Sequence, residues 1–374
     1  MHQRLNGLQC IGLIGFIFFS LVSTAFAETP RLLFIGNSYT YGNDLEQMTA
    51  KLMAKASSDW EAVEADRHAL GGARFVQHLA EADGTNGETN LRTKILGPAY
   101  FAVMLQEQSQ IPGFPQANPT YQESSSSFAG LNQLVQSNGA HTLALMTWAR
   151  RSGDSQNALR FPDFKVMQSH LRDGYFQYAT SQTTDNRLVA VVPAGLAFEK
   201  VYDDIVAAGE DPLDEASLFW NLYVGDGSHP SLTGSYLTAC TLYGSLTGQR
   251  LDSLEWAPEG IDDASRDAIQ AAANFAVFDS HVAEDAPALF LRPPQTQEEP
   301  DSEEGSEPEE ETDTETEVED EVSPEPVSPA EPEPAASGGC SGCNASQGLS
   351  FYLLIPALWL FRQRSIVGGL RLER

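Results

Sequence analysis

Short apolar segments alternate with longer amphipathic segments along the middle of the chain. Five segments have the length and composition of buried strands: residues 31–36, 61–70, 99–106, 140–148 and 187–195. Five others have the length and apolar spacing of helices: residues 44–57, 120–139, 164–182, 231–248 and 262–281. Strands and helices that alternate in this way favour a parallel sheet covered on both faces. The pattern therefore predicts an α/β fold, a three-layer α/β/α domain with a five-stranded parallel sheet.

The pattern differs at the N-terminus, where residues 1–27 combine one arginine, an apolar run and the motif A-F-A. This layout is typical of a secretory signal peptide with a small-x-small cleavage site. A transmembrane anchor is the competing interpretation, but the uninterrupted apolar core, residues 10–19, is short for a membrane span. We therefore expect an exported protein whose mature chain begins at Glu28.

The pattern changes again after the last predicted helix. Residues 293–337 are rich in Pro, Glu, Ser and Thr, and the part from 298 to 334 has 18 Asp or Glu and no Lys or Arg. So little apolar surface cannot offset the entropy of ordering, which predicts an extended, disordered linker. Residues 338–374 then combine a Gly- and Cys-containing motif, a short apolar run and a basic end.

This C-terminal layout resembles the sorting signals of some Gram-negative bacteria, in which the tail is recognised and often removed. The resemblance implies the cell envelope or surface of such a bacterium, or secretion after the tail is processed. It also implies a sorting machinery as a partner, and contact with the membrane through the apolar run. Cys340 and Cys343 form a C-x-x-C without a second ligand pair, so sorting or lipid attachment fits them better than zinc or redox chemistry.

The domain between these ends, residues 28–292, carries 33 acidic and 17 basic residues, a net charge of −16. Such a charge disfavours nucleic acid as a partner and leaves glycans, small esters and lipids open. Cys240 is the only cysteine of the domain, so no disulfide within it is expected. The HExxH, Walker A and GxGxxG patterns are absent, and we predict no metal or other cofactor.

The first predicted strand ends in Gly-Asn-Ser, which places Ser38 at the carboxyl edge of the sheet, where α/β proteins bind ligands. A nucleophilic serine needs a base, and the base needs a group that fixes its tautomer. Asp226 and His229 lie three residues apart in the sequence DGSHPS, a tight turn just before a predicted helix. The other histidines have no nearby carboxylate in a Gly-rich loop. Ser38, His229 and Asp226 are therefore the candidate catalytic triad.

Three segments resemble sequence blocks of the SGNH (GDSL-like) hydrolases. FIGNSYT is similar to the first block, with Asn where many members carry Asp, and DGSHPS is similar to the last. LGGARF is similar to the second block, whose glycine donates a backbone N–H to the oxyanion. The third block usually supplies an asparagine, and here that place reads LQEQS. The resemblance spans residues 31–248 and implies the flavodoxin-like fold of that family.

The resemblance also implies an oxyanion hole. Its donors would be the backbone N–H of Ser38, that of Gly72 or of the less favoured Gly71, and one side-chain amide. Because the usual asparagine is missing, Gln106 or Gln108 must supply this amide. We prefer Gln106, which directly ends the apolar run.

Together these features predict an exported serine esterase that hydrolyses a carbohydrate O-acyl ester, or another small acyl ester, through an acyl-enzyme intermediate. A lipase or thioesterase of the same family is one alternative, and a catalytically weak glycan-binding surface module is another. A structural surface protein with an accidental triad is the weakest alternative. Tyr39, Tyr41, Trp148 and Trp220 could line a sugar-binding groove, although core packing is their default interpretation. Glu107 has no predicted role beyond that of a loop acid.

Overall fold

The computed structural model describes residues 29–87, 89–184 and 187–280 of the 374-residue chain. The predicted signal peptide, acidic linker and C-terminal tail, with Cys340 and Cys343, lie outside the described residues. In the part of the chain that is described, no helix is both long enough and apolar enough to span a membrane.

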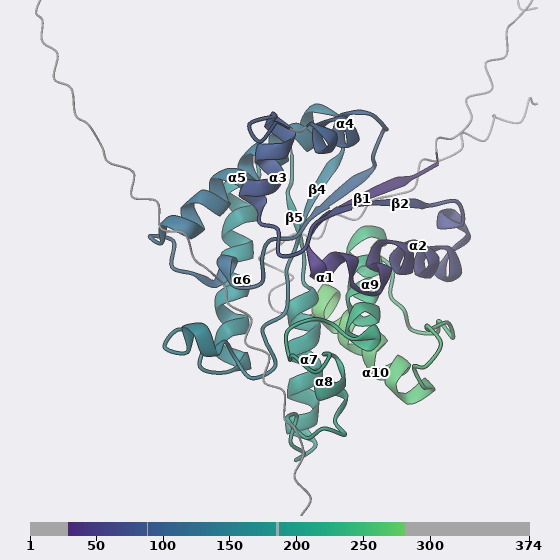
Figure 1. The fold of residues 1–374 in the computed structure, drawn as a ribbon. Helices are drawn as coiled ribbons and strands as arrows, with labels where there is room; N and C mark the ends of the chain where they lie inside the picture. Colours follow the sequence, from purple (N-terminus) through teal and green to yellow (C-terminus); the bar gives the residue numbers. More distant parts are fainter. Residues whose placement is uncertain (1–28, 88, 185–186, 281–374) are drawn as a thin grey trace, which may run out of the picture. The chain divides into compact units, whose positions relative to one another are not determined.

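The described part contains a five-stranded sheet in which every pair of neighbouring strands is parallel (Figure 1). The strands are β1 (Arg31–Gly36), β2 (Glu64–Ala69), β3 (Ala102–Leu105), β4 (His141–Leu145) and β5 (Ala190–Val192). Their order is β2-β1-β3-β4-β5, so the chain reverses direction across the sheet between β1 and β3. This is the flavodoxin-like order. The predicted α/β fold with a five-stranded parallel sheet is confirmed.

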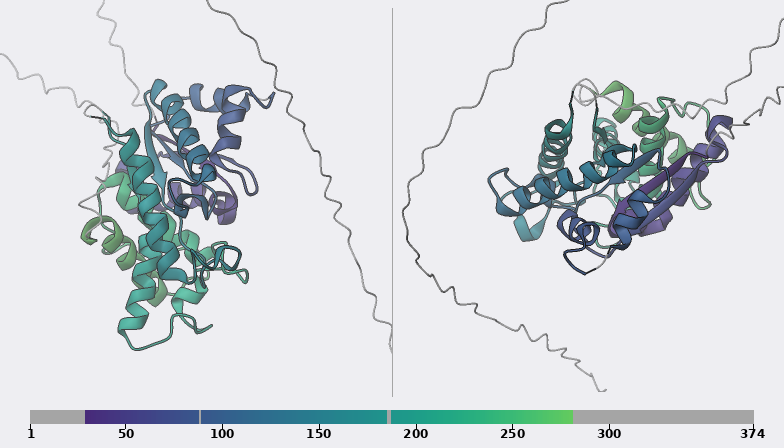
Figure 2. Two further views of the ribbon diagram at one scale, coloured as in Figure 1. Left: turned by 90° about the vertical axis from the view of Figure 1, so that its left-hand side faces the viewer. Right: turned by 90° about the horizontal axis from the view of Figure 1, so that it is seen from above.

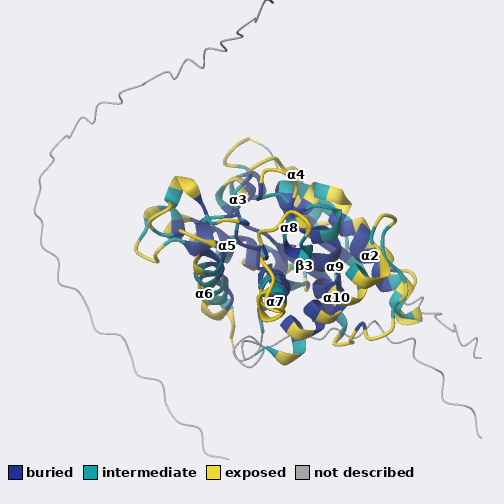
Figure 3. Cartoon of the chain, turned by 90° about the horizontal axis from the view of Figure 1, so that it is seen from below, coloured by how far each residue is buried: buried dark blue, intermediate teal, exposed yellow. Residues whose placement is uncertain are grey.

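Helices cover both faces of the sheet (Figures 1 and 2). One group of helices that pack against one another consists of α3 (Phe75–Asp83), α4 (Asn90–Leu96), α5 (Pro119–Ser137) and α6 (Phe164–Gln182). The other comprises α2 (Leu45–Ala56), α7 (Ala194–Ala207), α9 (Leu232–Thr247) and α10 (Asp263–Asn274). Two single-turn helices, α1 (Ser38–Tyr41) and α8 (Leu218–Asn221), lie in loops. Burial is greatest in the sheet and on the inner helix faces (Figure 3).

The strongest helical patterns of the sequence match α2, α5, α6, α9 and α10, whereas α3, α4 and α7 are not predicted by it. The sequence pattern wrongly predicts a strand at the start of α7, and the reason is clear. The apolar run 187–195 predicts one strand, but the strand ends at Val192 and a helix starts at Ala194. Pro193 lies between them, and proline has no N–H with which to continue a sheet ladder.

Helix α9 forms the centre of its layer, where it packs against α2, α7 and α10. Because it is covered on several sides, its apolar residues are not confined to one stripe, and Cys240 is buried within it as a free thiol. Ser231 caps its N-terminus by accepting a hydrogen bond from the Gly234 N–H (3.2 Å). The turn with Asp226 and His229 immediately precedes this cap, so a buried helix fixes one end of the turn.

Candidate active site

Ser38 lies at the carboxyl edge of the sheet. It follows β1, whose neighbours are β2 on one side and β3 on the other, and it is the first residue of α1. The carboxyl edge beside a reversal of strand order is where open α/β sheets bind ligands. The fold thus presents the Ser38 hydroxyl at the place where this class of protein binds its ligands.

The structure brings Ser38, His229 and Asp226 into one hydrogen-bonded chain. His229 Nε2 lies 2.8 Å from Ser38 Oγ, and His229 Nδ1 lies 2.6 Å from Asp226 Oδ2. Ser38 and His229 are 191 residues apart in sequence, so the fold alone creates the first contact. Partial burial favours a higher pKa for Asp226, but hydrogen bonds from the His229 ring and from backbone N–H groups lower it below its ordinary value. Asp226 therefore stays ionised at neutral pH, as a group that stabilises an imidazolium must.

The turn of Asp226 and His229 is held mostly by its own residues. Asp226 Oδ1 accepts hydrogen bonds from the backbone N–H groups of Ser228 (2.8 Å) and His229 (2.9 Å). Gly227 has φ +66°, a left-handed conformation that favours glycine. The Val224 N–H donates to the carbonyl of His229 (3.0 Å), which closes the turn. The Asp-Gly-Ser-His sequence therefore fixes its own geometry.

Aromatic packing joins this turn to the nucleophile loop. The rings of Tyr39 and Trp148 are stacked with centroids 5.0 Å apart, and the Tyr39 ring also meets that of His229 edge-on. The Tyr39 hydroxyl lies 2.5 Å from Ser228 Oγ, and Trp148 Nε1 donates to the carbonyl of Ser228 (3.1 Å). Both aromatic side chains are almost fully buried. The prediction that Tyr39 and Trp148 are core residues is confirmed. The Tyr39 ring contacts His229 directly, and Trp148 supports the Tyr39 ring.

The two remaining aromatic residues are less buried. Tyr41 is exposed, and its hydroxyl lies near Gly71, in the loop that carries the predicted oxyanion donors. Trp220 is half-buried and has the guanidinium of Arg151 over its ring, 3.4 Å from the centroid. The Trp220 ring therefore makes a cation–π contact with Arg151. Tyr41, which is exposed, is the more accessible of the two for contact with a ligand.

Gln106 supports the nucleophile loop. Its Oε1 accepts the backbone N–H of Asn37 (2.9 Å) and the hydroxyl of Thr40 (2.8 Å). Because the Asn37 N–H can only donate, the atom facing it must be the amide oxygen, and the amide nitrogen donates to the carbonyl of Glu107. A Cβ at Gly36 would lie 2.5 Å from Gln106 Oε1. Glycine at position 36 is thus required by the close approach of the Gln106 and Thr40 side chains.

Two further side chains fix the loop. His78 is buried, and its Nε2 lies 2.9 Å from the carbonyl oxygen of Gly36. Burial lowers the pKa of His78 to about 4, so the ring is neutral at pH 7 and donates from Nε2 to that carbonyl. Asn37 caps α1 by accepting the Tyr39 N–H (3.1 Å), and its Nδ2 donates to the carbonyl of Ala73 (3.0 Å). Asn37 therefore connects the nucleophile loop to the loop of Gly71 and Gly72.

The predicted oxyanion donors differ in their surroundings. Ser38 is the first residue of α1, so its N–H has no partner within the helix. Gly72 is exposed with φ +65°, and a Cβ there would meet no atom within 4 Å, so backbone conformation and not crowding explains the glycine. The buried Gln106 amide makes the contacts described above. Gln108 Nε2 donates to Gln110 (3.2 Å). The oxyanion role of each of these groups stays a prediction.

A polar cleft borders the candidate triad on the side of Asp226. None of its lining residues has an apolar side chain; besides two glycines they are Arg150, Arg151, Ser152, Ser155, Asp226 and Ser228. Arg150 forms an ion pair with the buried Asp154 (2.6 Å). The cleft therefore offers hydrogen-bond donors and acceptors but no apolar wall.

No protein-family model matches the chain, and no curated protein matches it. Several solved structures resemble it. A DUF4886 family protein from Bacteroides uniformis has a TM-score of 0.52 at 18% identity, over 69% of this chain and 99% of that one. A protein from Slackia heliotrinireducens, described as a candidate SGNH hydrolase, has 24% identity and a TM-score of 0.43 over 57% and 97% of the two chains. A catalytic mutant of an acetylxylan esterase from Geobacillus stearothermophilus has 14% identity and a TM-score of 0.38 over 58% and 94%.

The sequence singles out the three residues of the candidate triad but not every residue that supports them. Gln106 and His78 reach the nucleophile loop through buried contacts, and no local pattern marks them for that role, whereas Asn37 belongs to the Gly-Asn-Ser turn itself, where a turn residue that helps to fix the serine is expected. At 18% identity, the likeness to the Bacteroides protein is one of fold, and it shows that the chain has the α/β architecture of that protein.

Proposed function

We propose that the protein is a serine hydrolase of the SGNH type that cleaves a carboxylic ester. The observation that carries this proposal is the unbroken hydrogen-bonded chain from Ser38 Oγ through His229 to Asp226. Its position at the carboxyl edge of the sheet, beside the strand-order reversal, supports the same conclusion. The sequence blocks described above add the family resemblance.

In the proposed reaction, Ser38 Oγ attacks the ester carbonyl while His229 Nε2 accepts its proton. His229 then gives the proton to the leaving alcohol, and an acyl-Ser38 ester remains. Water attacks this ester with His229 again as the base, which releases the acid and restores Ser38. Asp226 holds the Nδ1 proton of His229 and stabilises the imidazolium, without itself becoming protonated.

The negative charge on the carbonyl oxygen would be bound by the N–H groups of Ser38 and Gly72. Each donor aimed at a developing oxyanion can contribute roughly 3 kcal/mol to transition-state binding. Gln106 Oε1 already accepts hydrogen bonds from Asn37 and Thr40. We therefore propose that the main role of Gln106 is to hold the loop that carries the Ser38 N–H in place. A direct contribution from its second amide hydrogen is compatible with this role.

The residues beside Asp226 are polar, which is compatible with a short acyl ester of a hydrophilic alcohol, such as a carbohydrate. A lipase or long-chain thioesterase needs an apolar surface for its acyl chain, and the cleft beside Asp226 has arginine, serine and aspartate instead. A carbohydrate O-acetyl ester is therefore the substrate class that we propose.

The test is hydrolysis of 4-nitrophenyl acetate, butyrate and palmitate and of an acetylated xylo-oligosaccharide by the wild-type chain and by Ser38→Ala. We expect activity on the acetyl esters that falls by at least about 10⁴-fold in the variant. Wild-type protein that is folded but inactive on every ester would favour a glycan-binding module. A steep preference for palmitate would favour the lipase alternative.

We also propose that the protein is exported and held at, or released from, a bacterial envelope by its terminal segments. The composition of residues 1–27 and 338–374 supports this location. Mass spectrometry of protein recovered from a secreting host should find an N-terminus at Glu28. Recovery of the intact N-terminus from the cytoplasmic fraction would contradict export.

A further inference from the structure

Glu107 follows Gln106 at the exit of β3 and is completely buried. The sequence suggests only a loop acid at this position. A buried carboxylate is costly unless it is hydrogen-bonded, so its partners define what the residue does. Neither of the proposed reaction steps uses this group.

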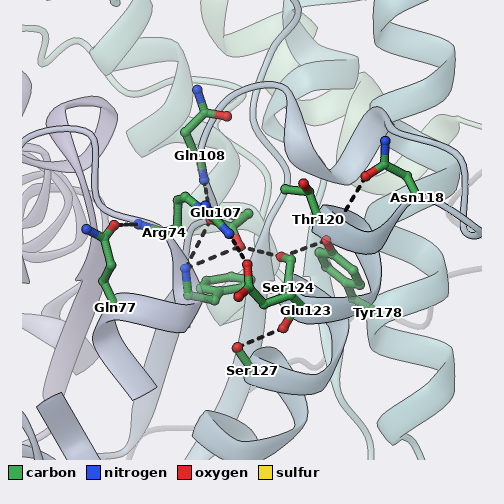
Figure 4. Close-up of polar contacts among 11 residues, drawn as sticks. Arg74, Gln77, Glu107, Gln108, Asn118, Thr120, Glu123, Ser124, Ser127 and Tyr178 are labelled. Atoms are coloured by element: carbon green, nitrogen blue, oxygen red, sulfur yellow. Dashed lines mark hydrogen bonds and ion pairs between the residues drawn. The ribbon is translucent and has the colours of Figure 1, made fainter. Parts of the chain in front are cut away.

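Four hydrogen bonds to three donors converge on the Glu107 carboxylate (Figure 4). Oε1 accepts the backbone N–H groups of Phe75 (3.1 Å) and Gln108 (2.7 Å). Oε2 accepts the Phe75 N–H (3.2 Å) and the hydroxyl of Ser124. Ser124 in turn accepts the hydroxyl of Tyr178 (2.8 Å), so Tyr178 and Ser124 both donate toward the carboxylate.

Phe75 makes this arrangement relevant to the proposed reaction. It is the first residue of α3, and it directly follows the loop of residues 70–74 that contains Gly71 and Gly72. Two residues before Phe75, in the same loop, the carbonyl of Ala73 accepts a hydrogen bond from the side chain of Asn37, the residue next to Ser38. The Glu107 carboxylate thus fixes the point where the loop enters α3, while its Gln108 contact fixes the exit of β3.

We propose that Glu107 is a positioning residue whose ionised carboxylate holds the loop of Gly72 in the geometry of an oxyanion hole. The inference rests on the proposed function, because the loop of Gly72 forms an oxyanion hole only if the protein is a hydrolase. Proton uptake by Glu107 would replace an acceptor by a donor. The Phe75 and Gln108 N–H groups cannot reverse, so the new O–H could only be given to Ser124, whose own hydroxyl must then turn away.

Burial of Glu107 disfavours its negative charge, whereas the hydrogen-bond donors around the carboxylate favour that charge. Arg74, at the N-cap of α3, is the cation on that side, and it forms an ion pair with Glu123 of α5. From α6, Tyr175 and Tyr178 face the carboxylate, and burial raises the pKa of both phenols, so they stay neutral.

Burial raises the pKa of Glu107 to about 7, although the hydrogen bonds from Ser124, Gln108 and Phe75 and the charge of Arg74 lower it. The carboxyl group therefore titrates in the range where an esterase works.

The main test compares pH profiles of kcat/KM for 4-nitrophenyl acetate hydrolysis by the wild-type chain and by E107Q. On the acid side, protonation of Glu107 should make the wild-type profile fall more steeply than that of E107Q near pH 7, and the two profiles should meet at lower pH, where both proteins have a neutral side chain at position 107. E107Q mimics the protonated acid, so its profile should lack this additional fall, with a plateau lowered roughly 10- to 100-fold by a misplaced loop. An E107Q profile that keeps the wild-type slope and plateau would overturn the proposal.

E81Q is the matched control for a buried carboxylate. Glu81 is also buried, accepts the backbone N–H of Leu91 (3.1 Å) and contacts His68. E81Q should keep the additional fall of the wild-type profile, because Glu81 does not contact the loop of Gly72. Loss of the additional fall in E81Q as well would show that any change of a buried carboxylate alters the profile, and would contradict a specific role for Glu107.

Two further measurements cover the cases in which E107Q does not fold or the chain hydrolyses no ester. Ser124→Ala removes one donor from the carboxylate and should move the acid limb to higher pH; an unmoved limb would count against the network. Amide hydrogen exchange of residues 70–76 needs no turnover and should be faster in E107Q than in E81Q or the wild type. Equal exchange in all three proteins would overturn the positioning role, whereas faster exchange in an inactive protein would sink only the proposed function.

Discussion

The two halves of the candidate triad are built in different ways. The nucleophile loop after β1 is buried and fixed by side chains distant in sequence, with Gln106 69 residues away from Asn37 and His78 42 residues away from Gly36. The turn of Asp226 and His229 has side chains that are 48% and 43% exposed, and most of its bonds lie within seven residues. One half depends on the packed core and the other largely on its own turn chemistry. Substitutions in the two halves should therefore separate effects on activity from effects on folding.

The largest effect without a loss of stability is expected from Asp226→Asn in the exposed half. An asparagine would present an N–H to His229 Nδ1 and favour the tautomer that cannot accept the Ser38 proton. We expect kcat to fall on the order of 10⁴-fold in ester hydrolysis. Thermal unfolding should change little, since the side chain is half exposed and an amide oxygen can still accept the turn's N–H groups. A large drop in melting temperature would show that the two halves do not differ as described.

In the buried half, Gln106→Leu should lower both activity and stability. The variant leaves the Asn37 N–H and the Thr40 hydroxyl without their acceptor, and an unsatisfied buried donor costs about 1–3 kcal/mol. The loop that carries Ser38 would shift, and we expect kcat/KM to fall roughly 10²- to 10³-fold. Denaturant unfolding together with initial-rate kinetics measures both quantities. A loss of activity without any loss of stability would instead favour a direct oxyanion role for the Gln106 amide.

A pH-dependent effect of similar origin is expected from His78. Its folded pKa of about 4 lies below its ordinary value of 6.5, so its contribution to stability is present above pH 6.5 and is lost as the pH falls toward 4. Relative to His78→Gln, which can still donate to the Gly36 carbonyl, the wild type should lose roughly 3 kcal/mol between pH 7.5 and 4. Urea unfolding of both proteins at several pH values measures this difference. A constant difference across that range would contradict a buried neutral imidazole behind the nucleophile loop.

The smallest effect is expected where the two halves meet. Tyr39→Phe keeps the stacking on Trp148 and removes the hydroxyl, which hydrogen-bonds Ser228 and also interacts with Ser109. A single hydrogen bond contributes about 1 kcal/mol, so kcat should fall less than 10-fold and stability should change by a similar free energy. Tyr39→Ala, which also removes the ring, should cost several times as much. Equal effects of the two variants would show that the stacked rings do not position the turn.

The comparison also explains what could be predicted from the sequence. The strand-helix alternation and the Asp-Gly-Ser-His turn depend on neighbouring residues, so local patterns are enough to predict them. The roles of Gln106 and Glu107 depend on the packing of β3 against β1 and of α3 against α5. Read alone, the segment LQEQS gives two candidate glutamines, of which Gln106 is preferred only because it ends the apolar run, and one acid without a partner. Only the fold shows that Gln106 reaches Asn37 and that Glu107 reaches Phe75.

The central claim is that Ser38 is a nucleophile activated by His229. The most direct measurement is labelling of the folded chain with a fluorophosphonate probe, followed by peptide mass spectrometry. We predict one probe per chain, attached to Ser38, with labelling that is abolished in Ser38→Ala and strongly slowed in His229→Ala. Absence of labelling in folded wild-type protein, or a label on another serine, would contradict the claim.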